Sequence, residues 1–243
     1  MIQKVLKLYS LLQLKLKEKK FNNRLKYVYC KTNSDTLIIV FSAFASHPRY
    51  NYMRALRHKN NVSKLFILDD FGYKGSYYWF EGGKDSPLTL TKGLIESIIK
   101  EGHYNNVLTM GTSKGGTCAI YYGLMFQAKD IYAGACQYYV GNYLNTPSHM
   151  PIMEAMMGRT VTYQDVELLN RKMPEQLKTY KESSSIVHLL YSKRENTYQE
   201  HILPLIRDLK DNHIAYREIV EDFENHNDVG KFFIPYIQHE IVS

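Results

Sequence analysis

The sequence has few of the residues that mark disulfide-linked, zinc-binding or membrane-spanning proteins. It contains only three cysteines in 243 residues, and because none occurs in a C-x-x-C arrangement, neither a disulfide scaffold nor a structural zinc site is expected. H-E-x-x-H is also absent, so no catalytic metal is expected. No apolar run approaches the roughly 20 residues of a membrane-spanning helix. These absences favour a globular protein of a reducing compartment, and we expect a cytoplasmic location.

Positive charge is in moderate excess. The 31 lysines and arginines exceed the 24 acidic residues, which gives a net charge of +7. This excess favours anionic partners such as phosphate-bearing polymers, nucleotides or a membrane surface, although a lysine-rich composition without a binding role explains it equally well. The 21 tyrosines are typical both of sugar-contacting surfaces and of core edges, so they decide nothing alone.

The first twenty residues have the pattern of an amphipathic helix. Apolar residues recur at helical spacing, at Ile2, Val5, Leu6, Tyr9, Leu12 and Leu16. Lys7 and Lys15 interrupt the apolar run, and no small-residue cleavage site follows, so no export signal is expected. The helix could lie on a membrane surface, but packing on the domain or on a second subunit of a homo-oligomer is the favoured interpretation. We therefore treat residues 1–25 as a helical segment and residues 26–243 as one domain.

Strands and helices alternate along the rest of the chain. Runs of β-branched and aromatic residues predict strands at 26–30, 36–41, 65–68, 105–110, 131–136, 185–191 and 214–220. Helical patterns occur at 86–102, 117–126, 199–209 and 229–239. The segment 137–181 is rich in methionine and proline, is expected to be irregular with short helical patches, and is typical of a lid or insertion. The alternation predicts an α/β fold with a mostly parallel sheet, helices on both faces and a small lid.

One glycine-rich turn carries a catalytic pattern. Gly111-Thr112-Ser113-Lys114-Gly115 fits G-x-S-x-G, in which small residues relieve crowding in a sharp turn from strand to helix. The motif follows a predicted strand and precedes a predicted helix, so Ser113 is the candidate nucleophile. An N-cap role for Ser113 is the alternative. A phosphate-binding P-loop is rejected because Lys114 precedes its glycines instead of following them.

An activated serine needs a base and a group that orients the base. In folds with this turn the histidine follows the last strand, and His226 has that position, in the polar loop before the final helix. An ordinary exposed loop histidine is the alternative. The acid is expected after the preceding strand, where Glu195 is the first carboxylate. Asp222, Asp69 and Asp70 are rivals for this role, and Glu195 could also be a solvated loop charge.

The same arrangement predicts two backbone donors for an oxyanion. The N–H of Lys114, directly after the nucleophile, is the first. The second is expected in Phe41-Ser42-Ala43-Phe44, the loop after an early strand, where Ala43 and Phe44 are the candidates. The Lys114 side chain could attract an anionic substrate, or it could only solvate the start of the helix.

These motifs together resemble a known family. Phe41-Ser42-Ala43-Phe44, Tyr50-Asn51-Tyr52 and Gly111-Thr112-Ser113-Lys114-Gly115-Gly116, followed by a late loop histidine, are similar to the α/β-hydrolase-fold O-acetyltransferases of bacterial capsule biosynthesis. The resemblance covers most of the chain from about Lys26 onward. It implies an α/β-hydrolase fold and acetyl-CoA as the acetyl donor. The implied acceptor is a hydroxyl group of a surface polysaccharide, and the excess of positive charge would suit an anionic one.

The resemblance also assigns roles to residues. It implies a catalytic triad of Ser113, Glu195 and His226, in which the acid departs from the family's usual aspartate. Acetyl transfer would then be ping-pong, with the tyrosine-rich loop 72–79 and the lid at 137–181 excluding water. The lid and the N-terminal helix match the family poorly, so the identity of the acceptor is not implied.

Two other functions stay open, and the expected surroundings are those of capsule assembly. The same triad would serve an esterase that acts on acetylated carbohydrate, and a non-catalytic glycan-binding subunit of a capsule-assembly complex is the third reading. The expected location is the cytoplasm, where the protein could also bind peripherally at the inner face of the membrane, and no nucleic-acid partner is expected.

Overall fold

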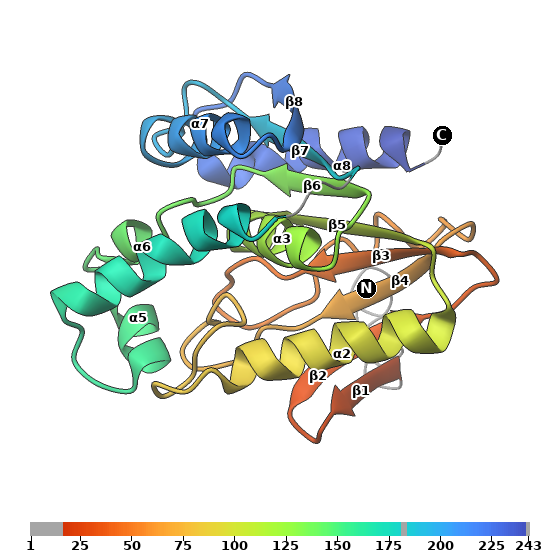
Figure 1. Cartoon of the computed structure of the whole chain (residues 1–243), viewed down its shortest axis with the longest axis horizontal. Helices are drawn as coiled ribbons and strands as arrows, with labels where there is room; N and C mark the ends of the chain where they lie inside the picture. The colour runs from red at the N-terminus through yellow and green to blue at the C-terminus, as the bar shows by residue number, and fades with distance from the viewer. Residues whose placement is uncertain (1–16, 181–183, 242–243) are drawn as a thin grey trace, which may run out of the picture.

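An eight-stranded sheet forms the centre of the computed structural model, which describes residues 17–180 and 184–241 (Figure 1). Its strands follow the spatial order β1-β2-β4-β3-β5-β6-β7-β8, in which β1 and β4 pair with β2 antiparallel and all other pairs are parallel. The strands are β1 (Glu18–Phe21), β2 (Leu25–Cys30), β3 (Thr36–Phe41), β4 (Ser63–Ile67), β5 (Asn106–Thr112), β6 (Asp130–Gly134), β7 (Ile186–Tyr191) and β8 (Ala215–Val220). The predicted mostly parallel sheet is confirmed.

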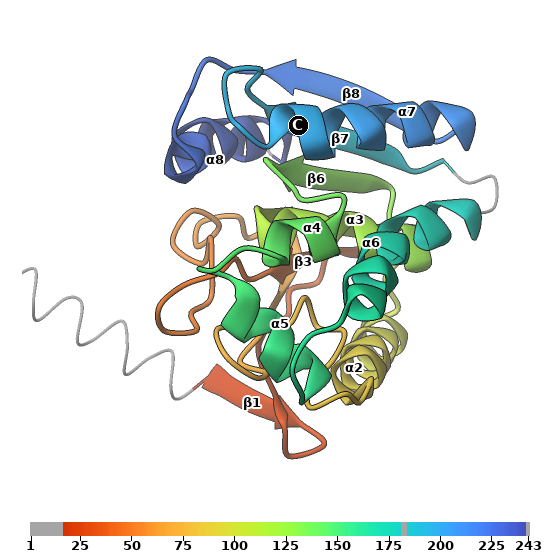
Figure 2. The same ribbon diagram turned by 90° about the vertical axis from the view of Figure 1, so that its left-hand side faces the viewer.

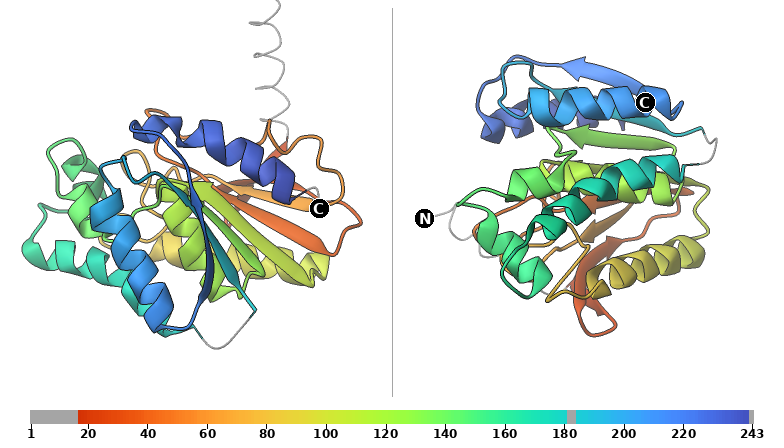
Figure 3. Two further views of the ribbon diagram at one scale, coloured as in Figure 1. Left: turned by 90° about the horizontal axis from the view of Figure 1, so that it is seen from above. Right: turned by 60° about the vertical axis from the view of Figure 1, so that its left-hand side comes forward.

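Helices cover both faces of this sheet. They are α2 (Ser86–Gly102), α3 (Lys114–Met125), α4 (Val140–Leu144), α5 (Met150–Met157), α6 (Tyr163–Lys178), α7 (Leu203–Asp211) and α8 (Val229–Glu240), with short turns η1 (Tyr198–Ile202) and η2 (His226–Asp228). The view from above shows α7 and α8 on opposite sides of the sheet (Figure 3). None of the described helices is both long and apolar enough to cross a bilayer.

Two apolar cores explain why β3 reads as an unbroken hydrophobic run. Leu37 and Ile39 pack in one core with residues of α2, α3 and α7, while Ile38 and Val40 pack in the other with residues of α8. Successive side chains of a strand point to opposite faces, so a strand buried on both faces has no polar side. The unbroken apolar sequence of β3 is therefore what a strand covered by helices on both faces requires.

The N-terminal segment differs from the expectation. Glu18–Phe21 form strand β1, so the helix expected through Lys20 is wrong for its last residues, and residues 1–16 lie outside the described part of the chain. Asn22 and Asn23, with φ of 45° and 57°, are the first two residues of the three-residue turn that connects β1 to β2. Asparagine tolerates this left-handed backbone, and the Asn-Asn pair was the signal for the hairpin.

The region expected to be irregular is largely helical. Residues 140–178 contain α4, α5 and α6, which lie next to one another beside α3 (Figure 2). Thr162 and Asp165 cap the start of α6 by the reciprocal hydrogen bonds of a capping box. Pro174 lies inside this sixteen-residue helix, and its presence misled the sequence interpretation because proline is disfavoured in helix interiors.

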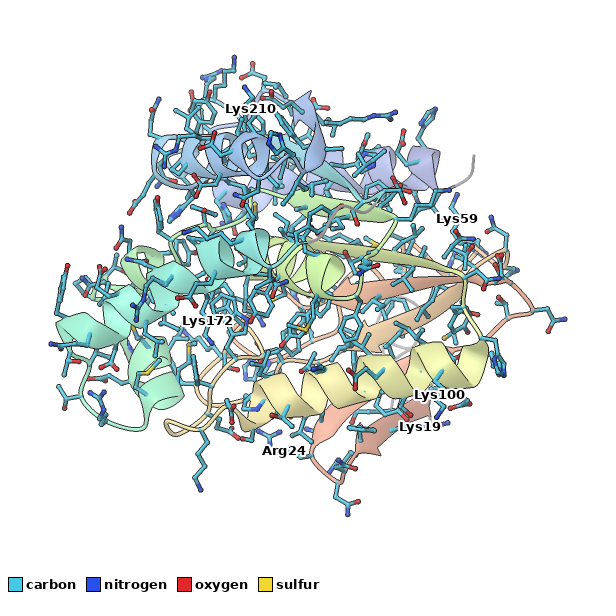
Figure 4. All side chains as sticks on the ribbon, in the orientation of Figure 1. Lys19, Arg24, Lys59, Lys100, Lys172 and Lys210 are labelled. Atoms are coloured by element: carbon cyan, nitrogen blue, oxygen red, sulfur yellow. The ribbon has the colours of Figure 1, made fainter. Side chains whose placement is uncertain are left out.

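Basic side chains occur on many elements. The residues labelled in Figure 4 include Lys19 on β1, Lys100 on α2, Lys172 on α6 and Lys210 on α7, so they come from several elements. The net positive charge is therefore distributed over several elements, and the total charge by itself does not identify a binding site.

Candidate active site

Ser113 lies in a strained turn between β5 and α3. Its backbone has φ of 53° and ψ of −128°, a conformation that is costly for any residue with a side chain. β5 ends at Thr112 and α3 begins at Lys114, so the chain reverses at Ser113 alone. Strain of this kind is typical of functional sites, where a reactive group has to be held in a fixed place.

The glycines of the motif are required by close backbone contacts. A Cβ on Gly111 would lie 2.3 Å from the carbonyl carbon of Gly115, and a Cβ on Gly115 would lie 2.7 Å from the carbonyl oxygen of Phe41. Both distances are shorter than real side chains allow. Glycine at these two positions therefore lets α3 start directly against β5 and β3, which fixes where Ser113 stands.

Glu195 and His226 come together although 31 residues separate them. His226 Nδ1 lies 3.0 Å from Glu195 Oε1, and Glu195 is only 2% exposed. Thr197 Oγ1 donates a hydrogen bond to the other carboxylate oxygen. The two residues follow β7 and β8, whose carboxyl ends lie side by side because these strands are parallel neighbours.

The rival carboxylates have other partners. Asp222 pairs with Arg194 at 3.0 Å. Asp69 pairs with Lys114 at 2.6 Å, and Asp70 pairs with Arg24 and Lys26. Glu195 is thus the carboxylate in contact with His226.

His226 and Ser113 share one cavity, and the second ring nitrogen of His226 has no partner in the described part of the chain. Both residues line this cavity, and His226 Nε2 is buried without a hydrogen-bond partner among the described residues. A buried polar atom without a partner is costly and calls for an explanation. A role as the general base that accepts the proton of Ser113 would explain it.

Ser113 Oγ has a partner that the sequence did not indicate. Gln137 Nε2 donates a hydrogen bond to Ser113 Oγ at 3.1 Å, and Gln137 is fully buried. Tyr143, on α4, is also close: burial and the charge of Glu195 raise the pKa of its phenol, and an interaction with Ser113 opposes this rise. Both residues fall in the segment expected to be an irregular lid, where no motif singled them out.

The two predicted oxyanion donors differ in their surroundings. Lys114 is the first residue of α3, where backbone N–H groups have no partner within the helix. The N–H of Ala43 donates to Asn51 Oδ1 at 3.0 Å, so this group is engaged. Phe44 lines the cavity beside Ala43 and Ser113. Of the two candidates in this loop, Phe44 is therefore the better second donor.

The side chain of Lys114 points into the protein. It is fully buried, pairs with Asp69 and lies 5.3 Å and 5.0 Å above the rings of Phe44 and Tyr78. Both expectations for this side chain, attraction of an anionic substrate and solvation of the helix start, are thus wrong. The reason is that the start of α3 packs against the loop after β4, which supplies Asp69.

The cavity in front of Ser113 is large and positively lined. It has a volume of about 1560 Å³, larger than the ~300–1,000 Å³ of an ordinary small-molecule site. Its described lining includes no aspartate or glutamate but six cationic side chains without an ion-pair partner among described carboxylates: Lys17, Lys31, Arg49, Arg54, Arg57 and Lys64, of which Lys64 bonds to backbone carbonyls. Such a lining attracts anions.

The tyrosine-rich loop does not cover this cavity. Tyr77, Tyr78 and Trp79 are fully buried in the core, where Tyr77 stacks on Trp79 with ring centroids 5.2 Å apart. From the segment 137–181, Tyr143 and His149 line the cavity. The expected lid role thus has support for the second segment and not for the first.

Metal ligands do not gather in the described part of the chain. Among residues 17–180 and 184–241, no group of three or more histidine, cysteine, aspartate or glutamate side chains could hold a metal ion.

The contact between Glu195 and His226 predicts a pH dependence of stability. Burial raises the pKa of Glu195, but hydrogen bonds from His226 and Thr197 outweigh it, and the pKa lies below the ordinary 4.5. A carboxyl with a depressed pKa stabilises the fold above its unfolded pKa, and the contribution is lost as the pH falls through the folded pKa. The difference in unfolding free energy between wild type and Glu195→Gln should therefore be largest near neutral pH and shrink below about pH 4.5.

Urea denaturation across this pH range measures the difference. Glu96→Gln is the control, because Glu96 forms an exposed pair with Lys92. Its effect should stay small at every pH. A Glu195→Gln effect that does not change with pH would contradict the prediction.

Comparison with known proteins gives the fold but no family by sequence. The sequence matches no protein-family model and no curated protein. The structure is similar to the capsule O-acetyltransferase of Neisseria meningitidis serogroup A, with a TM-score of 0.77, 21% identity and coverage of 93% of this chain and 94% of that one. A variant of that enzyme in complex with CoA gives a TM-score of 0.75, 20% identity and coverage of 92% and 94%.

A serine hydrolase is also similar. A fluorophosphonate-binding serine hydrolase of Staphylococcus aureus gives a TM-score of 0.65 at 14% identity, with 90% of each chain covered. At these identities the likenesses show the α/β-hydrolase fold. They confirm the predicted fold class, and the resemblance noted in the sequence is confirmed as a likeness in structure.

Proposed function

We propose that this protein is an O-acetyltransferase that moves acetyl from acetyl-CoA to a hydroxyl group of an anionic bacterial surface polysaccharide. The observation that carries the proposal is the contact of buried Glu195 with His226, which has an unpartnered Nε2 and lines the same cavity as Ser113 in its strained turn. An acid, a base and a serine in this relation are the parts of a nucleophilic triad. Likeness in fold to the meningococcal enzyme supports acetyl transfer as its use.

In the first half-reaction, Ser113 attacks the acetyl thioester. His226 Nε2 takes the Ser113 proton as Oγ bonds to the carbonyl carbon, while Glu195 stabilises the imidazolium that forms. The N–H groups of Lys114 and Phe44 stabilise the oxyanion. The C–S bond then breaks, His226 gives the proton to the departing thiolate, and acetyl-Ser113 remains.

In the second half-reaction, the acceptor hydroxyl takes the place of the thiol. His226 removes its proton as the acceptor oxygen bonds to the acetyl carbon, and the bond to Ser113 Oγ breaks. The proton returns to Oγ, which restores the enzyme. Transfer to sugar requires that water be kept from the acetyl-enzyme, and Tyr143 and His149 at the cavity are the candidates for this exclusion.

The charge of the cavity supports anionic substrates. Arg49, Arg54 and Arg57, with the three lining lysines, would attract the phosphates of CoA and a charged glycan. CoA bound to a variant of the meningococcal enzyme is consistent with this donor. A polysaccharide acceptor would also place the protein beside a capsule-assembly complex at the inner face of the membrane.

Hydrolysis of acetylated carbohydrate is the second candidate. It is favoured by the likeness in fold to the staphylococcal serine hydrolase. The triad chemistry is the same in both cases, and only the species that accepts the acetyl group differs.

Release of CoA thiol from acetyl-CoA, with and without a panel of anionic capsular polymers, tests the proposal. We expect release to depend on one class of polymer, acetyl to appear on that polymer, and KM to rise with added NaCl because salt screens the cationic lining. Exposed Lys92→Ala, outside the cavity, should leave the salt response unchanged. Thiol release without any acceptor, or cleavage of simple acetyl esters alone, would favour the hydrolase instead.

A further inference from the structure

Gln137 touches the reacting atom of the proposed mechanism. Its Nε2 lies 3.1 Å from Ser113 Oγ, and its side chain is fully buried just beyond the end of β6. Neither the G-x-S-x-G pattern nor the oxyanion hole that goes with it includes such a group. A buried amide aimed at the nucleophile therefore needs a role of its own.

The orientation of this amide is fixed by its neighbours. Tyr77 Oη donates a hydrogen bond to Gln137 Oε1 at 3.3 Å, which directs Nε2 towards Ser113. The backbone of Gln137 is held from both sides by Thr117, whose Oγ1 accepts from the Gln137 N–H at 2.9 Å and donates to the Gln137 carbonyl at 2.8 Å. Thr117 lies on α3, one turn after the nucleophile.

Two residues that hold this arrangement have a strained backbone. Tyr77 and Tyr78 both have φ of 56°, which is rare for bulky side chains, and both are fully buried. The strained pair brings the Tyr77 hydroxyl to Gln137 and the Tyr78 hydroxyl to the backbone N–H of Ser42, at 3.0 Å, in the loop of the second oxyanion donor. Strain that serves two contacts behind one cavity is typical of a pre-organised site.

We propose that Gln137 is a further catalytic residue, which donates a hydrogen bond to Ser113 Oγ throughout the reaction. In the resting enzyme the bond occupies a lone pair of Oγ, so the serine proton is directed towards His226. When Oγ leaves acetyl-Ser113, it carries negative charge until His226 protonates it, and a hydrogen bond to a developing anion is stronger than one to a neutral hydroxyl. Gln137 transfers no proton and forms no covalent bond.

The inference rests on the proposed function only in that Ser113 is the nucleophile. It predicts two effects in Gln137→Met, which keeps the length of the side chain but has no donor. The rate of labelling by a fluorophosphonate probe should fall about tenfold, and the breakdown of acetyl-enzyme should slow as well. One donor to an oxyanion is worth ~10²–10³ in rate, and a donor to Oγ is expected to contribute less.

Gln137→Glu supplies a readout that a purely structural role would not move. A protonated carboxyl can donate to Ser113, whereas a carboxylate can only accept, and burial raises the pKa of such a carboxyl. The ratio of its labelling rate to that of the wild type should therefore fall as the pH rises. If Gln137→Met fails to fold, the pH dependence of Gln137→Glu still tests whether a donor at position 137 contributes to the reactivity of Ser113.

The experiment measures fluorophosphonate labelling rates and the burst of p-nitrophenol from p-nitrophenyl acetate. Gln176→Met is the matched control, because Gln176 is a nearly buried glutamine on α6 that bonds to Thr179, and its labelling should equal that of the wild type. Labelling of Gln137→Met within twofold of wild type, with a constant ratio for Gln137→Glu, overturns the inference and leaves the proposed function standing. A wild type that is not labelled at Ser113 overturns both.

Discussion

Ser113→Ala should lower kcat/KM for acetyl transfer by about 10⁴-fold or more, because no other group can form the acetyl-enzyme. The remaining oxyanion donors and the cavity would still bind acetyl-CoA, so the dissociation constant for CoA should change little. Thiol release and equilibrium binding of CoA, measured on the same preparation, separate these two quantities. Loss of turnover with retained binding is the expected result.

Ser97→Ala is the control for this substitution. Ser97 is an exposed residue of α2, and its replacement should leave turnover within twofold of the wild type. Turnover above about 1% of wild type in Ser113→Ala would contradict the serine mechanism. The protein would then bind acetyl-CoA or glycan without the triad chemistry.

Asp69→Ala should cost about 3–5 kcal/mol of unfolding free energy. Asp69 and Lys114 form an ion pair at 2.6 Å in which both side chains are fully buried, so the substitution leaves an uncompensated charge inside the protein. It also removes an acceptor from the N–H groups of Ser76 and Tyr78. Urea or thermal unfolding followed by circular dichroism measures the loss. Because Lys114 follows the nucleophile directly, turnover should fall with it.

A double variant separates the charge from the packing. Asp69→Ala combined with Lys114→Met should be less destabilised than Asp69→Ala alone, because no buried charge remains. Lys92→Ala, which breaks an exposed pair with Glu96, should change the stability by less than ~0.5 kcal/mol. A double variant that is as unstable as the single one would show that the loss comes from the hydrogen bonds to the loop and not from the charge.

Much of the fold follows from local patterns in the chain. Ser86-Pro87 predicts the start of α2, and the helix extends to Gly102 as expected. The run Thr36–Phe41 is β3 without a change of boundary. The prediction was wrong where the chain adopts a locally uncommon structure. Examples are α6, which contains Pro174, and the hairpin turn at Asn22 and Asn23, which have positive φ.

The sequence by itself determined the strand-turn-helix at Ser113, because the two glycines allow a close approach that other residues forbid. It also determined the candidate pair of Glu195 and His226, since the order of strands along the chain places both at the same edge of a parallel sheet. These features depend on short segments and on chain order. Both are present in the sequence before folding.

Only the tertiary structure decided what surrounds these residues. The inward direction of Lys114, the engagement of the Ala43 N–H by Asn51 and the approach of Gln137 to Ser113 each join segments that are 8 to 45 residues apart. Such contacts depend on how helices and loops pack over the sheet, and the side chains involved have no periodic pattern. A buried charge or amide acquires its role from its partner, and the partner is defined only once the chain has folded.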